Sequence, residues 1–239
     1  MTMTGDVQIY AGDIAYTGTR KEYALGSRGV TEGGAIYRYA RAGAVALAPG
    51  KLTVASTIVA NHENIAVAAA AAAGASEVTV TLGATEATLN QYADGYLVVN
   101  DAAGEGTAYR ISGHPAADAS ASLTVKLSDD VRVALTTSSE VTLLANEFAD
   151  IVISAADQAD KAAGIPNNTI PAGEFGWVQT QGVCSALADE ALAIGSTCTI
   201  GSSVAGALEV ADLIGEQAVA VAIQAGVDTE YRAVSLILE

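Results

Sequence analysis

Large apolar side chains are scarce in this chain of 239 residues, which has two Phe, one Trp and two Met. Alanine, glycine, valine, threonine and serine must therefore build most of its core. Small and β-branched residues suit short strands that pack closely in sandwiches and barrels. The composition predicts an all-β protein, and the length allows one large or two modest domains.

Long apolar runs are missing as well. The alanine-rich run at 66–73 is much shorter than a membrane-spanning helix and is followed by polar residues. The N-terminal segment lacks the basic and apolar regions of a signal peptide. We therefore expect a protein that is synthesised in the cytoplasm and has no membrane partner.

Basic residues are few, since 11 Lys and Arg stand against 27 Asp and Glu, a net charge of −16. A phosphate backbone is bound by clustered Lys and Arg, so we do not expect a nucleic-acid partner. The charge is also uneven. Residues 1–51 hold six basic and four acidic side chains, a net charge of +2, whereas the other 188 residues hold five and 23, a net charge of −18.

Five of the nine tyrosines lie in the same first segment. Tyr and Arg are enriched at protein–protein contacts. Two interpretations stay open: an edge strand with a solvated face, or an arm that docks onto a neighbouring subunit. In the second interpretation the contact residues are Tyr10, Tyr16, Arg20, Tyr23, Arg28, Tyr37, Arg38, Tyr39 and Arg41.

Histidine and cysteine are nearly absent. His62 and His114 are far apart in turn-like settings, and we expect both to be exposed loop residues. Cys184 and Cys198 do not form a zinc pattern and are expected to be buried thiols, with a disulfide left open. The acidic turn at 100–105 lacks EF-hand spacing, so an ordinary turn is favoured over a calcium site. The sequence predicts a protein that is not an enzyme and has no cofactor or metal, with only a chance pair of converging carboxylates left open.

Alternating hydrophobicity predicts strands almost everywhere after residue 75, for example at 78–82, 107–111 and 123–127. Residues 175–182 hold the single Trp beside a Phe and are expected at the centre of a packed barrel face. Short helices are expected at 86–92 and 157–163, and the alanine run at 66–73 is expected to be a linker. The predicted organisation is an extended N-terminal arm with the first strands over 1–60, a β-meander domain over 61–147 and a small C-terminal β-barrel over 148–239.

Three stretches resemble structural proteins of tailed-bacteriophage heads. They are 23–43, which begins Tyr-Ala-Leu-Gly-Ser-Arg-Gly-Val, 90–111, which begins Asn-Gln-Tyr-Ala-Asp-Gly-Tyr-Leu, and 173–182, Gly-Glu-Phe-Gly-Trp-Val-Gln-Thr-Gln-Gly. The resemblance implies a capsid decoration (cement) protein on the virion surface, without catalytic residues. Its implied partners are the major capsid protein and further copies of itself in a homotrimer. The alternatives are another virion component, such as a head fibre base, tail-tube or baseplate protein, and a non-viral β-rich binding module.

Overall fold

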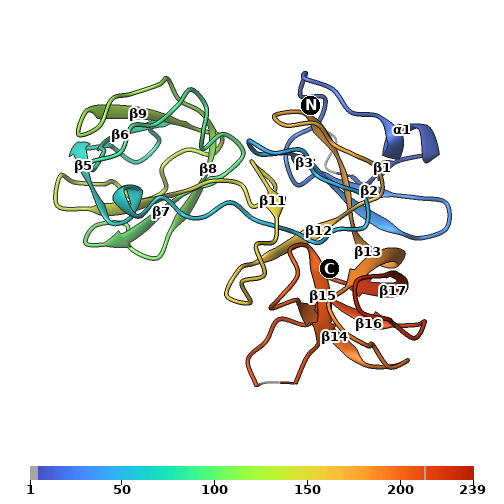
Figure 1. Ribbon diagram of the computed structural model, residues 1–239. Coiled ribbons are helices and arrows are strands. Elements are labelled where there is room, and N and C mark those ends of the chain that lie inside the picture. The colour runs from blue at the N-terminus through green and yellow to red at the C-terminus, as the bar shows by residue number, and fades with distance from the viewer. Residues whose placement is uncertain (1–4, 213) are drawn as a thin grey trace. The chain divides into compact units, whose positions relative to one another are not determined.

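The computed structural model describes residues 5–212 and 214–239, which are almost entirely β structure and irregular connections (Figure 1). Helix within this described part is confined to α1 (Ala11–Ala15) and the 3-10 turn η1 (Ala60–His62). The predicted all-β fold is confirmed. The chain divides into two compact units: the barrel unit, Thr57–Asn146, and the sheet unit, which combines Met1–Ser56 with Glu147–Glu239.

The barrel unit contains a closed barrel of six strands, ordered β10–β5–β6–β9–β8–β7, with β7 pairing back to β10. The predicted meander is wrong in its connectivity, because β6 pairs with β9 and not with β7. Alternation of apolar and polar residues identifies strands but not their partners. Because β10 pairs with both β5 and β7, the barrel closes without a free edge. The strands are β5 (Ile65–Ala69), β6 (Glu77–Thr81), β7 (Tyr96–Asp101), β8 (Ala108–Gly113), β9 (Ser122–Leu127) and β10 (Glu140–Leu144).

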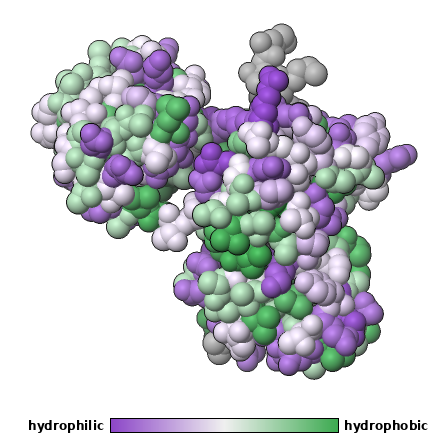
Figure 2. All heavy atoms as spheres, turned by 45° about the horizontal axis from the view of Figure 1, so that its top comes forward, coloured by the Kyte–Doolittle hydropathy of each residue, from purple (hydrophilic) through white to green (hydrophobic). Residues whose placement is uncertain are grey.

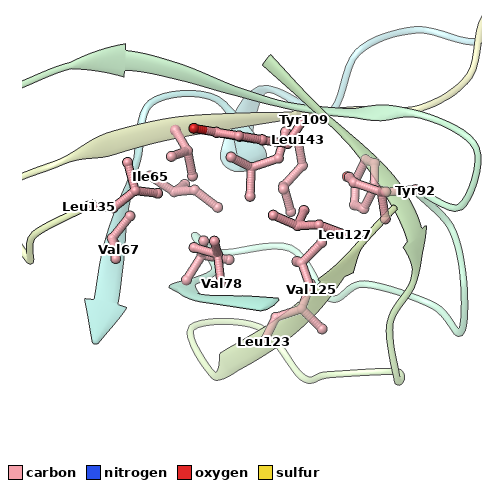
Figure 3. Packing of buried hydrophobic residues seen from close by; sticks show 14 of the residues in the cluster. Ile65, Val67, Val78, Tyr92, Tyr109, Leu123, Val125, Leu127, Leu135 and Leu143 are labelled. Carbon is pink, nitrogen blue, oxygen red and sulfur yellow. The ribbon is translucent and has the colours of Figure 1, made fainter. Parts of the chain in front are cut away.

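Alternation along the barrel strands sends one set of side chains into a common core. Val78 of β6, Leu123 and Val125 of β9, and Tyr109 of β8 are all buried there and point into the same interior in Figure 3. The backbone of Gly95 also approaches β10 closely, because a Cβ atom there would lie 2.1 Å from the carbonyl oxygen of Leu144. Small residues thus allow the strands of this barrel to pack tightly.

Three local predictions fail. The segments 86–92 and 157–163 contain turns, bridges and extended residues instead of helices. Seven residues are too few to offset the cost of helix nucleation without strong tertiary support. The alanine run at 66–73 is no linker, because it forms most of β5 and a further bridge from Ala71 to Leu135.

The sheet unit contains an eleven-stranded sheet. Five of its strands form a closed circuit of pairings, β13–β15–β14–β16–β17 and back to β13. This small C-terminal barrel uses only the second half of β13, whereas the sequence predicted a barrel from residue 148, and β11 and β12 pair with β4 instead. The free thiols of Cys184 and Cys198 are buried in its core, as expected. The eleven strands are β1 (Val7–Gln8), β2 (Arg28–Val30), β3 (Ile36–Arg41), β4 (Thr53–Val54), β11 (Val152–Ile153), β12 (Ala162–Pro166), β13 (Phe175–Ala188), β14 (Thr197–Ile200), β15 (Ala207–Val210), β16 (Ala220–Ala222) and β17 (Tyr231–Ile237).

The expected N-terminal arm is instead part of the sheet unit. Strand β3 pairs antiparallel with the first half of β13, with Tyr39 opposite Trp177 and Tyr37 opposite Gln179. The second half of β13 pairs with β17, so one long strand joins the N-terminal segment to the C-terminal barrel. An extended arm is therefore wrong for β1–β4, because these strands are paired within the sheet and Tyr37 and Tyr39 pack in one core with Phe175 and Trp177.

Both histidines are buried, so the expectation of exposed loop histidines is wrong. The Nε2 atom of His114 accepts a hydrogen bond of 3.0 Å from the backbone N–H of Tyr92, and its Nδ1 lies 2.7 Å from the carbonyl oxygen of Pro115. Nε2 accepts a hydrogen bond and Nδ1 donates one, which fixes the neutral tautomer that carries its proton on Nδ1. Burial lowers the pKa of His114, and the neighbouring His62 adds to this effect.

Acid is expected to destabilise the barrel unit through His114. The folded unit protonates this ring less readily than the unfolded chain does, because burial lowers the pKa of His114 below its ordinary value of 6.5. The unfolded state therefore holds more protons below that pH, and the free energy of unfolding falls as the pH drops, by at most about 1.4 kcal/mol per pH unit. Urea unfolding at about pH 7 and about pH 5 measures this, and His114→Asn should flatten the dependence. Equal wild-type stability at both pH values would contradict the prediction.

Candidate interaction surface

Four of the nine predicted contact residues are exposed. Tyr10 and Tyr16 flank α1 with 63% and 55% of their surface accessible, and Arg20 and Tyr23 follow in the same irregular segment. This segment, residues 10–23, is held against β13 by a backbone bridge between Gly18 and Phe175. The structure thus presents three tyrosines on a segment that is already attached to the sheet.

The three remaining arginines form ion pairs within the sheet unit. Arg38 donates two hydrogen bonds to the Glu239 carboxylate, at 2.9 and 2.7 Å, and Arg41 makes a similar pair with Asp150, at 2.7 and 2.5 Å. Arg28 pairs with Asp6 and, at 3.7 Å, with Glu239. These guanidinium groups join parts of the chain that are distant in sequence, and the side chains of Arg28 and Arg41 stay about a third exposed.

The carboxylate of Glu239 is the centre of this ion-pair cluster. Burial raises the pKa of Glu239, but hydrogen bonds from Arg38 and Thr180 and the charges of Arg38 and Arg28 outweigh burial and lower it below its ordinary value. The group is therefore ionised at neutral pH. It joins β3, β13 and the residues that follow β17.

Tyr37 and Tyr39 are core residues with only 4% of their surface exposed, so the expectation that they contact a partner is wrong. The Tyr39 ring packs edge-on against Trp177 at 5.1 Å between ring centroids. The hydroxyl of Tyr37 donates to Oε1 of Gln179 at 3.0 Å and accepts from Nδ2 of Asn167 at 2.9 Å. Sequence alone showed the tyrosine cluster but not which members face inward.

A second exposed surface was missed by the sequence analysis. In the paired parts of β13 and β17, alternate residues fill the core of the C-terminal barrel, namely Cys184, Ala186, Ala188, Val234 and Leu236. Most residues between them are exposed or half-buried. Eight outward residues form a surface that we call the β17 face. They are Val183 and Ser185 of β13, Tyr231, Ala233, Ser235 and Ile237 of β17, Val221 of β16 and Ile223 just after β16.

The β17 face carries no charged side chain, although the sheet unit has 17 acidic and eight basic residues. Val183 is 64% exposed, and Tyr231 and Ile237 are 46% and 44% exposed. Figure 2 shows hydrophobic side chains gathered in patches on the surface of this unit. One signal in the sequence could have revealed the face: residues 231–238 are largely apolar at odd as well as even positions, whereas a solvated barrel strand alternates apolar with polar residues.

A shallow pocket of about 490 Å³ continues the β17 face through Ser185 and Tyr231. The Tyr231 ring lies directly against Gly50, which has a φ of +73° and where a Cβ atom would come within 2.7 Å of the ring. Only glycine accommodates both the left-handed backbone and this close approach. The pocket is lined by Pro49, Gly50, Pro166, Asn167, Ser185 and Tyr231.

Within residues 5–212 and 214–239, no group of three or more His, Cys, Asp or Glu side chains could hold a metal ion. The same residues include no helix that is long and apolar enough to cross a membrane. In the acidic turn at 100–105, the Asp101 carboxylate accepts a hydrogen bond from the backbone N–H of Ala102.

The chain was compared with protein-family models, curated proteins and solved structures, and no match was found in any of the three.

Proposed function

We propose that this chain is a virion structural protein, a capsid decoration or cement protein that binds the outer surface of a tailed-phage capsid. In this role it stabilises contacts between subunits of the major capsid protein and acts as a homotrimer. The exposed tyrosines of residues 10–23 carry the proposal, together with the resemblance of three stretches of the sequence to phage head proteins.

The tyrosine segment has the properties of a prepared docking site. Tyr10 and Tyr16 expose large rings, and Tyr23 packs against Trp177 at 5.4 Å between ring centroids. Tyrosine supplies contact area with few rotatable bonds. Because the segment is already bridged to β13 at Gly18, binding would order little additional backbone, and more of the contact energy would remain as affinity.

The charge distribution is compatible with a place on a particle surface. Residues 57–146 hold ten acidic and three basic side chains, and they form the barrel unit. A strongly acidic unit that faces solvent keeps crowded particles apart by charge repulsion. Several copies joined in one oligomer would also bind multivalently, so that modest individual contacts give stable attachment.

Quantitative mass spectrometry of purified particles of the encoding virus tests this function. A decoration protein is expected at a copy number of the same order as the major capsid protein. Absence from the particles would contradict the proposal. A copy number far below that of the capsid protein would instead indicate a tail or baseplate component.

A further inference from the structure

We propose that the pocket beside Gly50 and Tyr231 binds a neutral saccharide. The proposal goes beyond capsid binding, because none of the residues that line this pocket is among the predicted contact residues. It rests on three properties of the pocket: a hydrogen-bond acceptor whose direction is fixed from the core, two hydroxyl groups beside a half-exposed aromatic ring, and the lack of charge.

Strand pairing brings the polar side chains of the pocket together. Strand β12 pairs with the first half of β13, and the second half of β13 pairs with β17 (Figure 1). Asn167 directly follows β12, Ser185 lies in β13, and Tyr231 begins β17. The backbone N–H of Gly50 donates a hydrogen bond of 2.9 Å to the carbonyl oxygen of Pro166. The lining residues are therefore held by backbone hydrogen bonds within one unit.

A chain of hydrogen bonds from the core fixes the direction of the Asn167 amide. Nε2 of Gln179, a residue that is 1% exposed, donates to the carbonyl oxygens of Gln181 and Val183 at 3.1 and 3.0 Å, so its Oε1 faces the other way. The hydroxyl of Tyr37 donates to this Oε1, and Nδ2 of Asn167 donates to the Tyr37 hydroxyl oxygen and to Oε1 of Gln179 at 2.9 and 3.3 Å. Because both amide protons of Asn167 are used inward, its Oδ1 faces outward and can accept a hydrogen bond from a ligand.

Two hydroxyl groups and one aromatic ring complete the pocket. Within residues 5–212 and 214–239, the side-chain hydroxyls of Ser185 and Tyr231 form no hydrogen bond with another group. The Tyr231 ring lies against Gly50 on the side of its Cδ1 and Cε1 atoms, yet the residue is 46% exposed. The pocket thus offers an acceptor, two groups that donate or accept, and an apolar ring surface, a combination typical of small-molecule sites.

The pocket offers no charge to an ionic ligand. None of its six lining residues is charged, and beside Tyr231 the side chains of Glu230 and Arg232 pair with each other. A phosphate, a carboxylate or an ammonium group would lose its water shell there without gaining a partner of opposite charge. The ligand is therefore neutral.

The fixed acceptor distinguishes between neutral ligands. A purely apolar partner would cover Oδ1 of Asn167 without a donor, and a polar atom that is buried unpaired costs free energy. A proline-rich peptide suits an aromatic-lined pocket, but proline has no backbone N–H to donate to this oxygen. A neutral saccharide carries hydroxyl donors around its ring and apolar C–H groups on its faces, so it matches all three properties.

A proton–nitrogen correlation NMR titration of the full-length chain tests the proposal. The ligands are maltotriose, cellotriose, lactose and chitotriose, which present neutral glucosyl, galactosyl and N-acetylglucosaminyl rings, and decaproline is the competing ligand. With at least one saccharide we expect saturable shifts, at millimolar concentrations, of the Asn167 side-chain amide and of the backbone amides of Gly50 and Ser185. The pocket of about 290 Å³ in the barrel unit, whose lining includes Glu86 and Asp118, should show no change.

Two variants remove single features of the pocket. Tyr231→Val removes the ring and keeps a residue suited to a strand, and Ser185→Ala removes one hydroxyl. Tyr96→Val is the matched control, because Tyr96 is 47% exposed on β7 of the barrel unit. We expect the saccharide to bind at least about tenfold more weakly to Tyr231→Val and about threefold more weakly to Ser185→Ala, with unchanged binding to Tyr96→Val. All three variants should retain the wild-type circular dichroism spectrum.

The proposal is overturned if no saccharide binds wild type, if Tyr231→Val and Ser185→Ala bind as wild type does, or if only decaproline shifts the pocket signals. The titration contains no capsid, so none of these results bears on the particle-composition test of the proposed function.

Discussion

Trp177→Ala is expected to lower the free energy of unfolding of the sheet unit by about 3–5 kcal/mol, the usual cost of removing a buried tryptophan. Trp177 is 3% exposed and packs against the rings of Tyr23 and Tyr39 at 5.4 and 5.1 Å between centroids. The glycine at position 29 leaves room for it, since a Cβ atom there would lie 2.8 Å from the indole. Trp177 is the single tryptophan of the chain.

Urea unfolding followed by far-UV circular dichroism measures this change. Val45→Ala is the control in the same unit, because Val45 is 66% exposed and its truncation should change the free energy of unfolding by less than about 0.5 kcal/mol. A similarly small effect for Trp177→Ala would show that the aromatic cluster is not the main core of the N-terminal strands.

Most strands were predictable from the sequence because their burial alternates with a period of two. The segments around Val78, Ile111 and Val125 were assigned as strands, and the structure places all three side chains in the barrel core. Trp177 was expected at the centre of a barrel face; it is buried, but it packs with Tyr39 in the core of the N-terminal strands and not in the C-terminal barrel. These predictions depend on local patterns, which the chain satisfies within a few residues.

The pairing of strands and the burial of tyrosine and histidine side chains depend on long-range contacts. Strand β10 pairs with β5, more than seventy residues earlier, and no local pattern encodes that pairing. Tyr37 and Tyr39 are buried because β13 lies beside β3, although the sequence distance between them is more than 130 residues. His114 is buried, and its ring accepts a hydrogen bond from the backbone N–H of Tyr92, 22 residues earlier in the chain. The candidate surfaces could be assigned only once these pairings were known.

The prediction of contact residues was also limited by the unknown strand pairing. The tyrosine and arginine cluster was visible in the sequence, but only Tyr10, Tyr16, Arg20 and Tyr23 remain exposed in the structure. Removal of the first 41 residues would therefore delete β1–β3 from the sheet and would not test a contact alone. Point substitutions at exposed tyrosines avoid this difficulty.

The double variant Tyr10→Ser and Tyr16→Ser is expected to bind decoration-free capsids at least about a hundredfold more weakly than wild type. Each tyrosine at the centre of a contact typically contributes about 2 kcal/mol or more, and about 2.7 kcal/mol corresponds to a hundredfold change in Kd. Raised salt should weaken wild-type binding only in part, because buried aromatic contacts are not screened. Both residues are exposed, so the fold should be retained.

Tyr96→Ser provides the matched control, because Tyr96 is 47% exposed on β7 of the barrel unit and undergoes the same chemical change. The decisive measurement is the Kd of wild type, the double variant and this control for the same decoration-free capsids. The account predicts strong binding by wild type and Tyr96→Ser and a large loss for the double variant. Equal binding by all three proteins would contradict the tyrosine contact, and an absence of wild-type binding would contradict the proposed function itself.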